Sequence, residues 1–353
     1  MIPRVEVLLS NETNLYHFSM INTGLVSLAD RGAIDLRYRA PRGGEENRLV
    51  ADPLAVCLFV RDSPTDRPLL LVIDLHDQGD VFAPAALGRC DAYFKRSFHP
   101  AANRRLDENQ NEKVRPFGLN FACRSPGSTG RLMAAIGPRL ALQGPRGWKK
   151  IRYFLALPFL GDYEQPPDVP VEPTVVFQTR VWEAHEAADG EAERLNRDRV
   201  EVIRALKGAF GGRYRGGLMP TPLALREYPD EVSPHPARRR LYTAMSKKNL
   251  IGVYTAGLFE STAFKLPEYL AASQCIVAET PRNGLPSPLV DGEHYLSFRT
   301  ASECVAACRR LLEDRELARS MRLANWSYYQ AEVAPAARLE SMINQARPAP
   351  SAA

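Results

Sequence analysis

Short apolar runs rich in β-branched residues recur in both halves of the chain, with segments of helical character between them. In the first half they cover residues 54–60 and 69–75, and in the second half residues 174–178, 249–254 and 275–278. Such runs are typical of parallel strands that are buried on both faces of a sheet. The alternation predicts βαβ units, and hence an α/β fold with a doubly wound, Rossmann-like sheet in each half.

A proline-rich segment separates the two halves. Residues 162–173 contain four prolines, which suit a stiff linker better than the interior of a helix or strand. We therefore expect residues 1–165 to form one domain and residues 166–335 a second. Residues 336–353 would add the end of a C-terminal helix and a disordered tail.

Composition narrows the classes of protein to consider. The 353 residues suffice for two domains, and no apolar run approaches the length of a transmembrane helix. The six cysteines form no Cys-x-x-Cys pair, so we expect buried, reduced thiols in a cytoplasmic protein. The net charge of +5 permits an anionic ligand, or peripheral association with an anionic inner membrane face, but without an aromatic-basic motif it does not indicate nucleic acid.

Two carboxylates stand eight positions apart around the start of a predicted helix, residues 264–272. They are Glu260 and Glu268. A loop-to-helix junction presents free backbone N–H groups and the positive end of a dipole, which suit a phosphate. Eight residues at helical rise span about 12 Å, the reach from a sugar across a diphosphate to a ribose. The junction therefore predicts a site for a nucleotide-sugar.

The segments around this junction resemble a known family. Residues 268–278, Glu-Tyr-Leu-Ala-Ala-Ser-Gln-Cys-Ile-Val-Ala, are similar to the E-A-M-A-x-G-x-P-V-V-A segment of GT-B glycosyltransferases, above all the retaining family 4, or glycosyl transferases group 1, type. With Glu260 they complete an E-x7-E pattern. Residues 286–298 resemble the G-x-x-E-x-I-x-D-G-x-N-G-x-L region that follows in these enzymes. The resemblance extends over about residues 171–335.

Two shorter segments add to the resemblance. Residues 175–180, Val-Val-Phe-Gln-Thr-Arg, are similar to the strand-x-G-R start of the family's second domain. In the first half, residues 72–77, Val-Ile-Asp-Leu-His-Asp, resemble a strand that ends in H-D.

The resemblance implies a GT-B fold, in which two Rossmann-like domains face a central cleft. It implies a hexosyltransferase-like enzyme that moves a sugar from a UDP- or GDP-linked donor to a glycan or lipid-linked acceptor, with retention of configuration, in polysaccharide biosynthesis. We expect no cofactor besides the donor. Because no Asp-x-Asp stands at a strand end in a plausible metal-binding position, we also expect transfer without a metal.

The resemblance also assigns roles to residues. Arg180 would stabilise the charge that develops on the diphosphate, and Glu268 would accept hydrogen bonds from two ribose hydroxyls. Glu260 would hold hydroxyls of the transferred sugar, and His76 would reach the donor sugar or orient the acceptor. Ser261, Thr262 and Lys265 complete the donor-binding set, and Tyr16, His17 and Asp77 are the acceptor-side candidates.

Each assignment has a plainer alternative. Arg180 would then be a surface residue at a strand end, Glu268 a first-turn glutamate that complements the helix dipole, and His76 a structural histidine. Ser-Thr-Ala at 261–263 stands where the family has Gly-Phe-Gly, and His185 stands where it has lysine. These departures keep open a protein that binds a nucleotide-sugar or glycan without turnover. A GT-B nucleotide-sugar epimerase is a further alternative, although no convincing acid/base set is evident.

Overall fold

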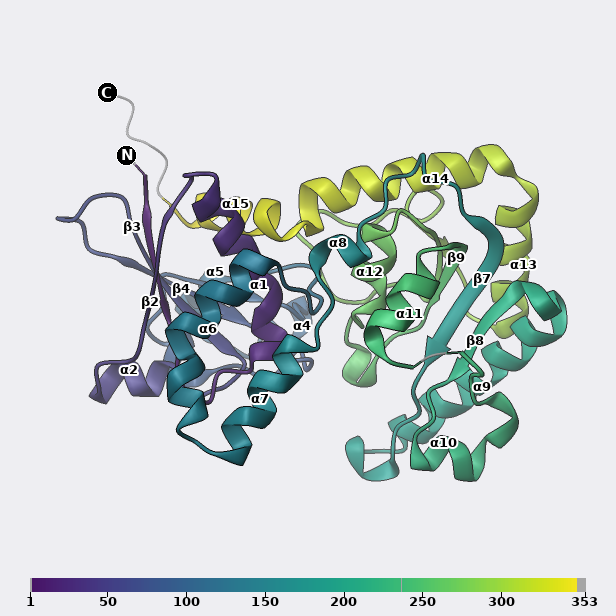
Figure 1. Ribbon diagram of the computed structural model, residues 1–353, viewed down its shortest axis with the longest axis horizontal. Coiled ribbons are helices and arrows are strands. Elements are labelled where there is room, and N and C mark those ends of the chain that lie inside the picture. The colour runs from purple at the N-terminus through teal and green to yellow at the C-terminus, as the bar shows by residue number, and fades with distance from the viewer. Residues whose placement is uncertain (1, 236, 348–353) are drawn as a thin grey trace. The chain divides into compact units, whose positions relative to one another are not determined.

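The computed structural model describes residues 2–235 and 237–347, and these residues form two compact units. As far as they are described, unit 1 comprises Met1–Leu160, Asn283–Pro286 and Gln330–Ala353, and unit 2 comprises Gly161–Arg282 and Ser287–Tyr329. Each unit contains one sheet covered by helices (Figure 1). The fold is α/β, with a Rossmann-like unit in each half.

The first division between the units falls inside the short helix α8 (Leu160–Tyr163), a few residues before the predicted linker. The chain returns to unit 1 after Tyr329. Residues 348–353 of the predicted tail lie outside the described residues.

The sheet of unit 1 has the strand order β2–β1–β3–β4–β5–β6. Strand β3 runs antiparallel to both of its neighbours, whereas the remaining pairs are parallel. The strands are β1 (Arg4–Leu8), β2 (Asp35–Arg39), β3 (Ala55–Arg61), β4 (Leu69–Asp74), β5 (Ala92–Lys95) and β6 (Val114–Pro116).

The prediction that residues 54–60 and 69–75 form parallel strands is therefore wrong for β3. The loop of residues 62–68 that joins β3 to β4 is too short to hold a crossover helix, so the two strands pair as a hairpin. Both strands are buried on both faces, and burial produces the same continuous apolar run in either direction.

Two groups of helices pack in unit 1. On one face of the sheet, α2 (Gly44–Leu49) and α3 (Pro84–Leu87) share a hydrophobic cluster with the strands. The second group contains α1, α6, α7 and α15, which contact one another (Figure 1). Their bounds are α1 (Leu15–Asp30), α6 (Pro126–Ala141), α7 (Pro145–Leu155) and α15 (Pro335–Ala346); the short α4 (Pro100–Asn103) and α5 (Glu108–Lys113) lie between β5 and β6 in the chain.

Helix α15 packs closely on α1. A Cβ atom added at Gly24 of α1 would lie 2.3 Å from the carbonyl oxygen of Pro335, so this contact requires a glycine. A π-helical turn, Tyr329–Val333, precedes α15.

The sheet of unit 2 has the order β11–β10–β9–β7–β8, and all neighbouring strands are parallel. The strands are β7 (Glu172–Thr179), β8 (Tyr214–Leu218), β9 (Asn249–Tyr254), β10 (Cys275–Ala278) and β11 (Leu296–Ser297). The predicted runs at 174–178, 249–254 and 275–278 are confirmed as strands. Because β8 and β9 lie on opposite sides of β7, the strand order reverses there, and such a switch point is where open α/β sheets bind ligands.

The helices of unit 2 include the long α9, which follows β7 in the chain and packs against α13 in the main hydrophobic core. Gly252 of β9 allows the ring of Tyr269 on α12 to approach, since a Cβ atom there would lie 2.7 Å from that ring. The helices are α9 (Glu191–Phe210), α10 (Pro222–Glu227), α11 (Arg239–Ser246), α12 (Lys265–Ala271), α13 (Ala301–Glu313) and α14 (Arg315–Tyr328).

All six cysteines are buried and none is in a disulfide, as predicted. Across residues 2–235 and 237–347, every helix is too short or too polar to cross a membrane.

Replacing Gly24 with alanine should destabilise unit 1, because the new methyl group would meet the backbone of α15. We expect the free energy of unfolding to fall by about 1–3 kcal/mol, the usual effect of overpacking. Gly130→Ala in α6 is the matched control, because nothing lies within 4 Å of its added Cβ atom. Urea denaturation that found equal stabilities for the two variants would contradict the described α1–α15 contact.

Candidate functional site

A pocket of about 550 Å³ lies at the carboxyl end of the sheet of unit 2. We call it the switch-point pocket, because it opens beside the strands where the order reverses. Residues after β9 and β10, the first half of α9 and the segment before α13 contribute to its wall. The lining residues are Glu191, Arg194, Leu195, Asp198, Arg199, Thr255, Ala256, Gly257, Glu260, Glu279, Thr280, Arg282, Phe298 and Arg299.

The buried side chain of Arg199 joins the ends of two strands at this pocket. Its Nη1 donates to the carbonyl oxygen of Arg180 after β7, at 2.7 Å, and its Nη2 donates to the carbonyl oxygen of Ala256 after β9, also at 2.7 Å. Its Nε donates to Thr255 Oγ1 at 3.3 Å. Burial lowers the pKa of Arg199 to about 10, so the guanidinium remains charged at neutral pH.

Glu279 supplies a carboxylate near this guanidinium. It follows β10, and its Oε2 accepts a hydrogen bond from the backbone N–H of Ala256 at 2.8 Å. Burial raises the pKa of Glu279, and the charge of Arg199 opposes that rise. The inner end of the pocket therefore combines an arginine and a carboxyl group that both have perturbed acidities, a combination often found at functional sites.

Sequence reasoning missed both residues, although one signal was present. On α9 the buried side includes Ala192, Asn196, Arg199, Val200 and Ile203, so an arginine stands in a stripe of otherwise uncharged residues. A charged residue on the buried face of an amphipathic helix requires partners inside the protein.

Glu260 lines the switch-point pocket and forms an ion pair there with Arg282. It ends a 3-10 turn, Leu258–Glu260, in which Phe259 and Glu260 have positive φ angles of 58° and 55°. The backbone N–H of Phe259 donates to Glu191 Oε1 at 2.7 Å, which ties this turn to the start of α9. Ionic and backbone contacts therefore hold a conformation that non-glycine residues adopt at a cost of about 1–3 kcal/mol each.

The backbone of this turn accounts for one of the two missing glycines, at position 261. Ser261 has a φ of −67°, which any residue can adopt, so its own position does not require glycine. An added Cβ atom at Gly257 would lie 2.6 Å from Ser261 Oγ, so a side chain there would displace the Ser261 hydroxyl. Ser261 and Thr262 are both buried, and neither is among the residues that line the pocket.

Glu268 lies in different surroundings from Glu260. Its side chain is only 6% exposed, and Oε1 accepts a hydrogen bond from Arg239 Nη1 at 2.8 Å. Lys265 Nζ stands 3.6 Å from the other carboxylate oxygen and lies over the ring of Tyr242. The two glutamates thus do not share one set of partners. Glu260 lines the pocket, whereas the buried Glu268 pairs with two partly exposed cations, of which the sequence reasoning missed Arg239.

Arg180 stands at the carboxyl end of β7. Its guanidinium pairs with Glu186 at 2.6 Å and lies over the ring of Trp182, with 3.5 Å between the Cζ atom and the ring centroid. The exposed His185 is in the same 3-10 turn as Glu186, Ala184–Glu186. The side chain of Arg180 is thereby held beside the strand end, while its carbonyl oxygen binds Arg199.

In unit 1, His76 is held between two aspartates after β4. Its Nδ1 lies 2.7 Å from Asp74 Oδ1 and its Nε2 lies 3.3 Å from Asp52 Oδ2. The hydrogen bonds to Asp52 and Asp74 raise the pKa of His76 to about 9, so the imidazole is cationic at neutral pH. Asp74 also pairs with the fully buried Lys95 at 3.0 Å. His76 therefore has the geometry of a structural cation, with both ring nitrogens engaged.

The three acceptor-side candidates lie in two different places. Asp77 forms an ion pair with the buried Arg96. Tyr16 and His17 lie in the first turn of α1, where Asn14 caps the helix by accepting hydrogen bonds from both of their backbone N–H groups.

Tyr16 and His17 line a second pocket, of about 500 Å³, between the start of α1 and α7. We call it the α7 pocket. Three cations from α7 line it as well: Arg146, Lys149 and Lys150. They come from the segment of residues 99–150, whose secondary structure the sequence did not reveal.

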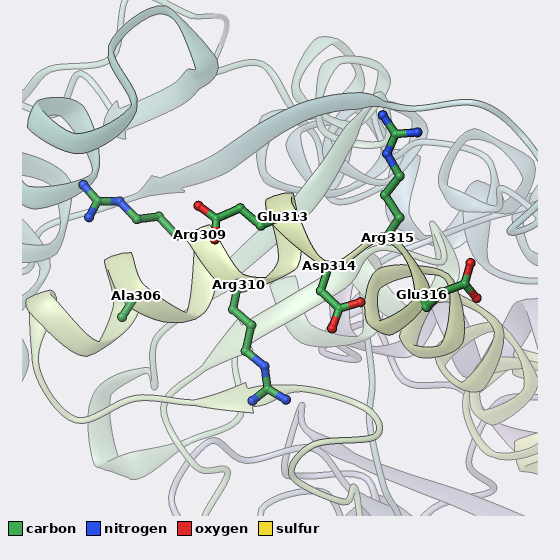
Figure 2. Close-up of a pocket in the computed structure, with 7 residues that line it drawn as sticks. All are labelled: Ala306, Arg309, Arg310, Glu313, Asp314, Arg315 and Glu316. Atoms are coloured by element: carbon green, nitrogen blue, oxygen red, sulfur yellow. The ribbon is translucent and has the colours of Figure 1, made fainter.

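A third hollow, of about 800 Å³, lies at the corner between α13 and α14. All of its lining residues are exposed. In Figure 2 the side chains of Arg309, Arg310 and Arg315 point away from one another, so they do not converge on a ligand. Among the described residues, no group of three or more histidine, cysteine, aspartate or glutamate side chains is placed to hold a metal ion.

Residues 199–344 match the protein-family model described as "Glycosyl transferase-like". The chain resembles the glycosyltransferases of GT-B fold. The matched segment contains most of unit 2, including β8 to β11, and extends into α15. It includes Arg199, Glu260, Glu268 and Glu279. No curated protein sequence matches the chain significantly.

Several solved structures are distantly similar. The C-terminal domain of a glycosyl transferase group 1 family protein (LpcC) from Francisella tularensis is 13% identical, with 46% of this chain and 86% of that chain covered and a TM-score of 0.33. A UDP-GlcNAc 2-epimerase from Neisseria meningitidis bound to UDP-GlcNAc is 11% identical, with coverages of 74% and 62% and a TM-score of 0.38. The S. aureus MnaA–UDP structure is also 11% identical, with coverages of 96% and 94% and a TM-score of 0.42. Likeness at this level assigns no ligand or residue role to this chain.

The contacts of His76 with Asp52 and Asp74 should make the stability of the protein depend on pH. Because its folded pKa of about 9 exceeds the ordinary value of 6.5, its contribution is complete below pH 6.5 and is lost as the pH rises towards 9. We expect the free energy of unfolding of the wild type to fall by about 2–3 kcal/mol over this range, relative to a His76→Gln variant. His185→Gln, at an exposed histidine, is the control and should follow the wild type. The measurement is denaturant titration at a series of pH values. If the free energies of unfolding of the wild type and His76→Gln changed equally with pH, the contacts of His76 with the two aspartates would be contradicted.

Proposed function

We propose that this protein is a glycosyltransferase that binds a UDP- or GDP-linked sugar in the switch-point pocket of unit 2. The observation that carries the proposal is the concentration of arginines in the wall of this pocket, next to a switch point: Arg194 and Arg199 from α9, Arg282 after β10 and Arg299 before α13. All but Arg194 lie within the segment that matches the glycosyl transferase-like model. Guanidinium groups remain charged at any physiological pH and bond phosphate oxygens bidentately. They are therefore suited to a diphosphate.

Binding of the donor would exchange one ion pair for another. Arg282 now pairs with Glu260, and a diphosphate that engaged Arg282 would release this carboxylate. Glu260 would then accept hydrogen bonds from hydroxyls of the transferred sugar. The charge that develops on the leaving diphosphate would be stabilised by Arg282 and Arg180. In this scheme Arg199 positions the two loops and touches no reacting atom.

The ribose would be bound at Glu268. One carboxylate oxygen of Glu268 is taken by Arg239, and the other faces Lys265 at a distance of 3.6 Å. A ribose hydroxyl that displaced the lysine would leave the shorter Arg239 bond intact and free Lys265 for a phosphate. Ser261 and Thr262 would support the donor through the backbone of the loop that they occupy, because their side chains are buried.

The acceptor would bind to unit 1. Tyr16 and His17 offer an aromatic wall in the α7 pocket, and the cations beside them suit an acceptor that carries a phosphate or another anionic group. His76 and Asp77 would act indirectly, because each is engaged in ion pairs at the end of β4. We propose a glycan or lipid-linked acceptor, and assembly of polysaccharide or glycolipid as the process, on the resemblance to the family.

Epimerisation of a nucleotide-sugar is the second candidate. It requires groups that remove and return a proton, and Glu279 favours it, because burial raises the pKa of this carboxyl group beside the same pocket. Incubation of the donor without any acceptor separates the candidates. An epimerised donor would support the epimerase. Hydrolysis of the donor to free sugar and nucleoside diphosphate, without epimerisation, would support the glycosyltransferase.

Donor binding should depend on Arg282 and Glu260. Because a hydrogen bond to a charged group contributes about 1.5–3 kcal/mol, Arg282→Ala should weaken binding of the matching nucleotide-sugar by about tenfold to a hundredfold. Glu260→Gln should reduce affinity for the nucleotide-sugar more than affinity for the nucleotide alone. The measurement is calorimetric titration after a thermal-shift screen of UDP, GDP, CMP and their sugars. Arg309→Ala at the α13–α14 corner is the control, and an equal loss there, or no stabilisation by any nucleotide, would refute the donor site.

Transfer should retain the anomeric configuration and need no metal. The arginines of the switch-point pocket would take the place of a divalent ion at the diphosphate. Product made in the presence of EDTA should form at the same rate as without it, and NMR should show the donor's anomeric configuration in the new linkage. An inverted linkage would overturn the retaining mechanism, and abolition by EDTA with rescue by Mg²⁺ or Mn²⁺ would overturn metal independence.

A further inference from the structure

Helix α7 has one buried stripe, which fixes its rotation. Gly147, Ile151 and Phe154 face the interior of unit 1. A Cβ atom added at Gly147 would lie 1.7 Å from the carbonyl oxygen of Leu140 on α6, so the two helices pack with their backbones in close approach. This approach determines which residues of α7 remain outside.

The outer side of α7 carries large hydrophobic residues. Trp148 is 55% exposed, Tyr153 63% and Leu155 41%, and Leu142 at the tip of the α6–α7 hairpin is 89% exposed. Among the described residues eleven large hydrophobic side chains are exposed, and four of these lie within residues 142–155. Isolated exposed hydrophobic residues are ordinary on a protein surface, but such a concentration marks an interaction surface.

The same helix is strongly basic. It carries Arg146, Lys149, Lys150 and Arg152 and no acidic residue. Arg146 and Lys150 pair with Glu12, whereas Lys149 and Arg152 form no ion pair within the described part of the chain.

The helical period arranges these side chains in neighbouring rows. Trp148, Arg152 and Leu155 follow one another at i, i+4 and i+7, and so lie along one row of the helix surface. Lys149 and Tyr153, at i and i+4, form the adjacent row. Cations therefore alternate with aromatic and aliphatic residues over one exposed surface. We call this surface, Leu142 with Trp148, Lys149, Arg152, Tyr153 and Leu155, the α7 face.

We propose that the α7 face docks unit 1 onto an anionic lipid surface, with α7 lying in the plane of the headgroups. Anionic lipids attract juxtaposed lysine and arginine residues, and tryptophan and tyrosine prefer the boundary between headgroups and acyl chains. The absence of acidic residues from α7 complements such a surface. The α7 pocket shares Arg146, Lys149 and Tyr153 with this helix, so the proposed acceptor site would open beside the membrane.

The test uses the full chain and vesicles of phosphatidylglycerol mixed with phosphatidylcholine, compared with phosphatidylcholine alone. We expect cosedimentation with the anionic vesicles, weakened by added salt, and little with the neutral ones. Trp148→Ala with Arg152→Glu should weaken binding at least about tenfold. Neither residue lines the α7 pocket or the switch-point pocket. The matched control, Leu323→Ala with Arg310→Glu, removes an exposed leucine and reverses an exposed arginine in unit 2, and should bind as the wild type does.

The fluorescence of Trp148 provides a second readout of vesicle binding. Emission of the wild type should shift to the blue on anionic vesicles, and the shift should be lost in Trp148→Phe. Equal binding of the two double variants, or equal binding to neutral vesicles, would overturn the proposal. The wild type could instead self-associate without binding vesicles. If Trp148→Ala with Arg152→Glu then abolished this self-association, the α7 face would be an interface between copies of the chain. Nucleotide-induced thermal shifts of the same variants report separately on the proposed donor site.

Discussion

The candidate site depends on one buried guanidinium. Arg199 reaches from α9 to the carbonyl oxygens that follow β7 and β9, and so joins the loops on either side of the switch point. Burying this charge is unfavourable unless its donors are satisfied, and backbone carbonyls together with the nearby Glu279 provide the compensation. The positions of Ala256 and Gly257, and hence of the turn that carries Glu260, follow from this arrangement.

Periodicity made much of unit 2 predictable from the sequence. Strands β9 and β10 begin and end at the predicted residues, because each is strongly apolar and is bounded by polar or turn-forming residues. Strand direction was not predictable in unit 1. Because β3 is buried on both faces, its apolar run is like that of a parallel strand. The short loop at residues 62–68 was the better indicator of strand direction, since it permits only antiparallel pairing with β4.

At the candidate site the sequence indicated individual side chains but not the contacts between them. Arg180 pairs with the nearby Glu186. Motif spacing marks Glu260 and Glu268 as candidates, whereas their arginine partners come from distant segments. Arg282 and Arg239 meet these carboxylates through the fold, and a single sequence contains no signal for that pairing. For His76 the sequence did not indicate Asp52. This second carboxylate, together with Asp74, raises the pKa of the imidazole and makes it a cation.

The central claim is that a nucleotide-sugar occupies the switch-point pocket, and hydrogen–deuterium exchange with and without UDP- and GDP-sugars tests it most directly. The account predicts slower exchange of the backbone amides in residues 255–262 and 279–282, which form the strand ends and the turn around the pocket. Unchanged exchange in these segments with every nucleotide-sugar, or slowing confined to unit 1, would contradict the account.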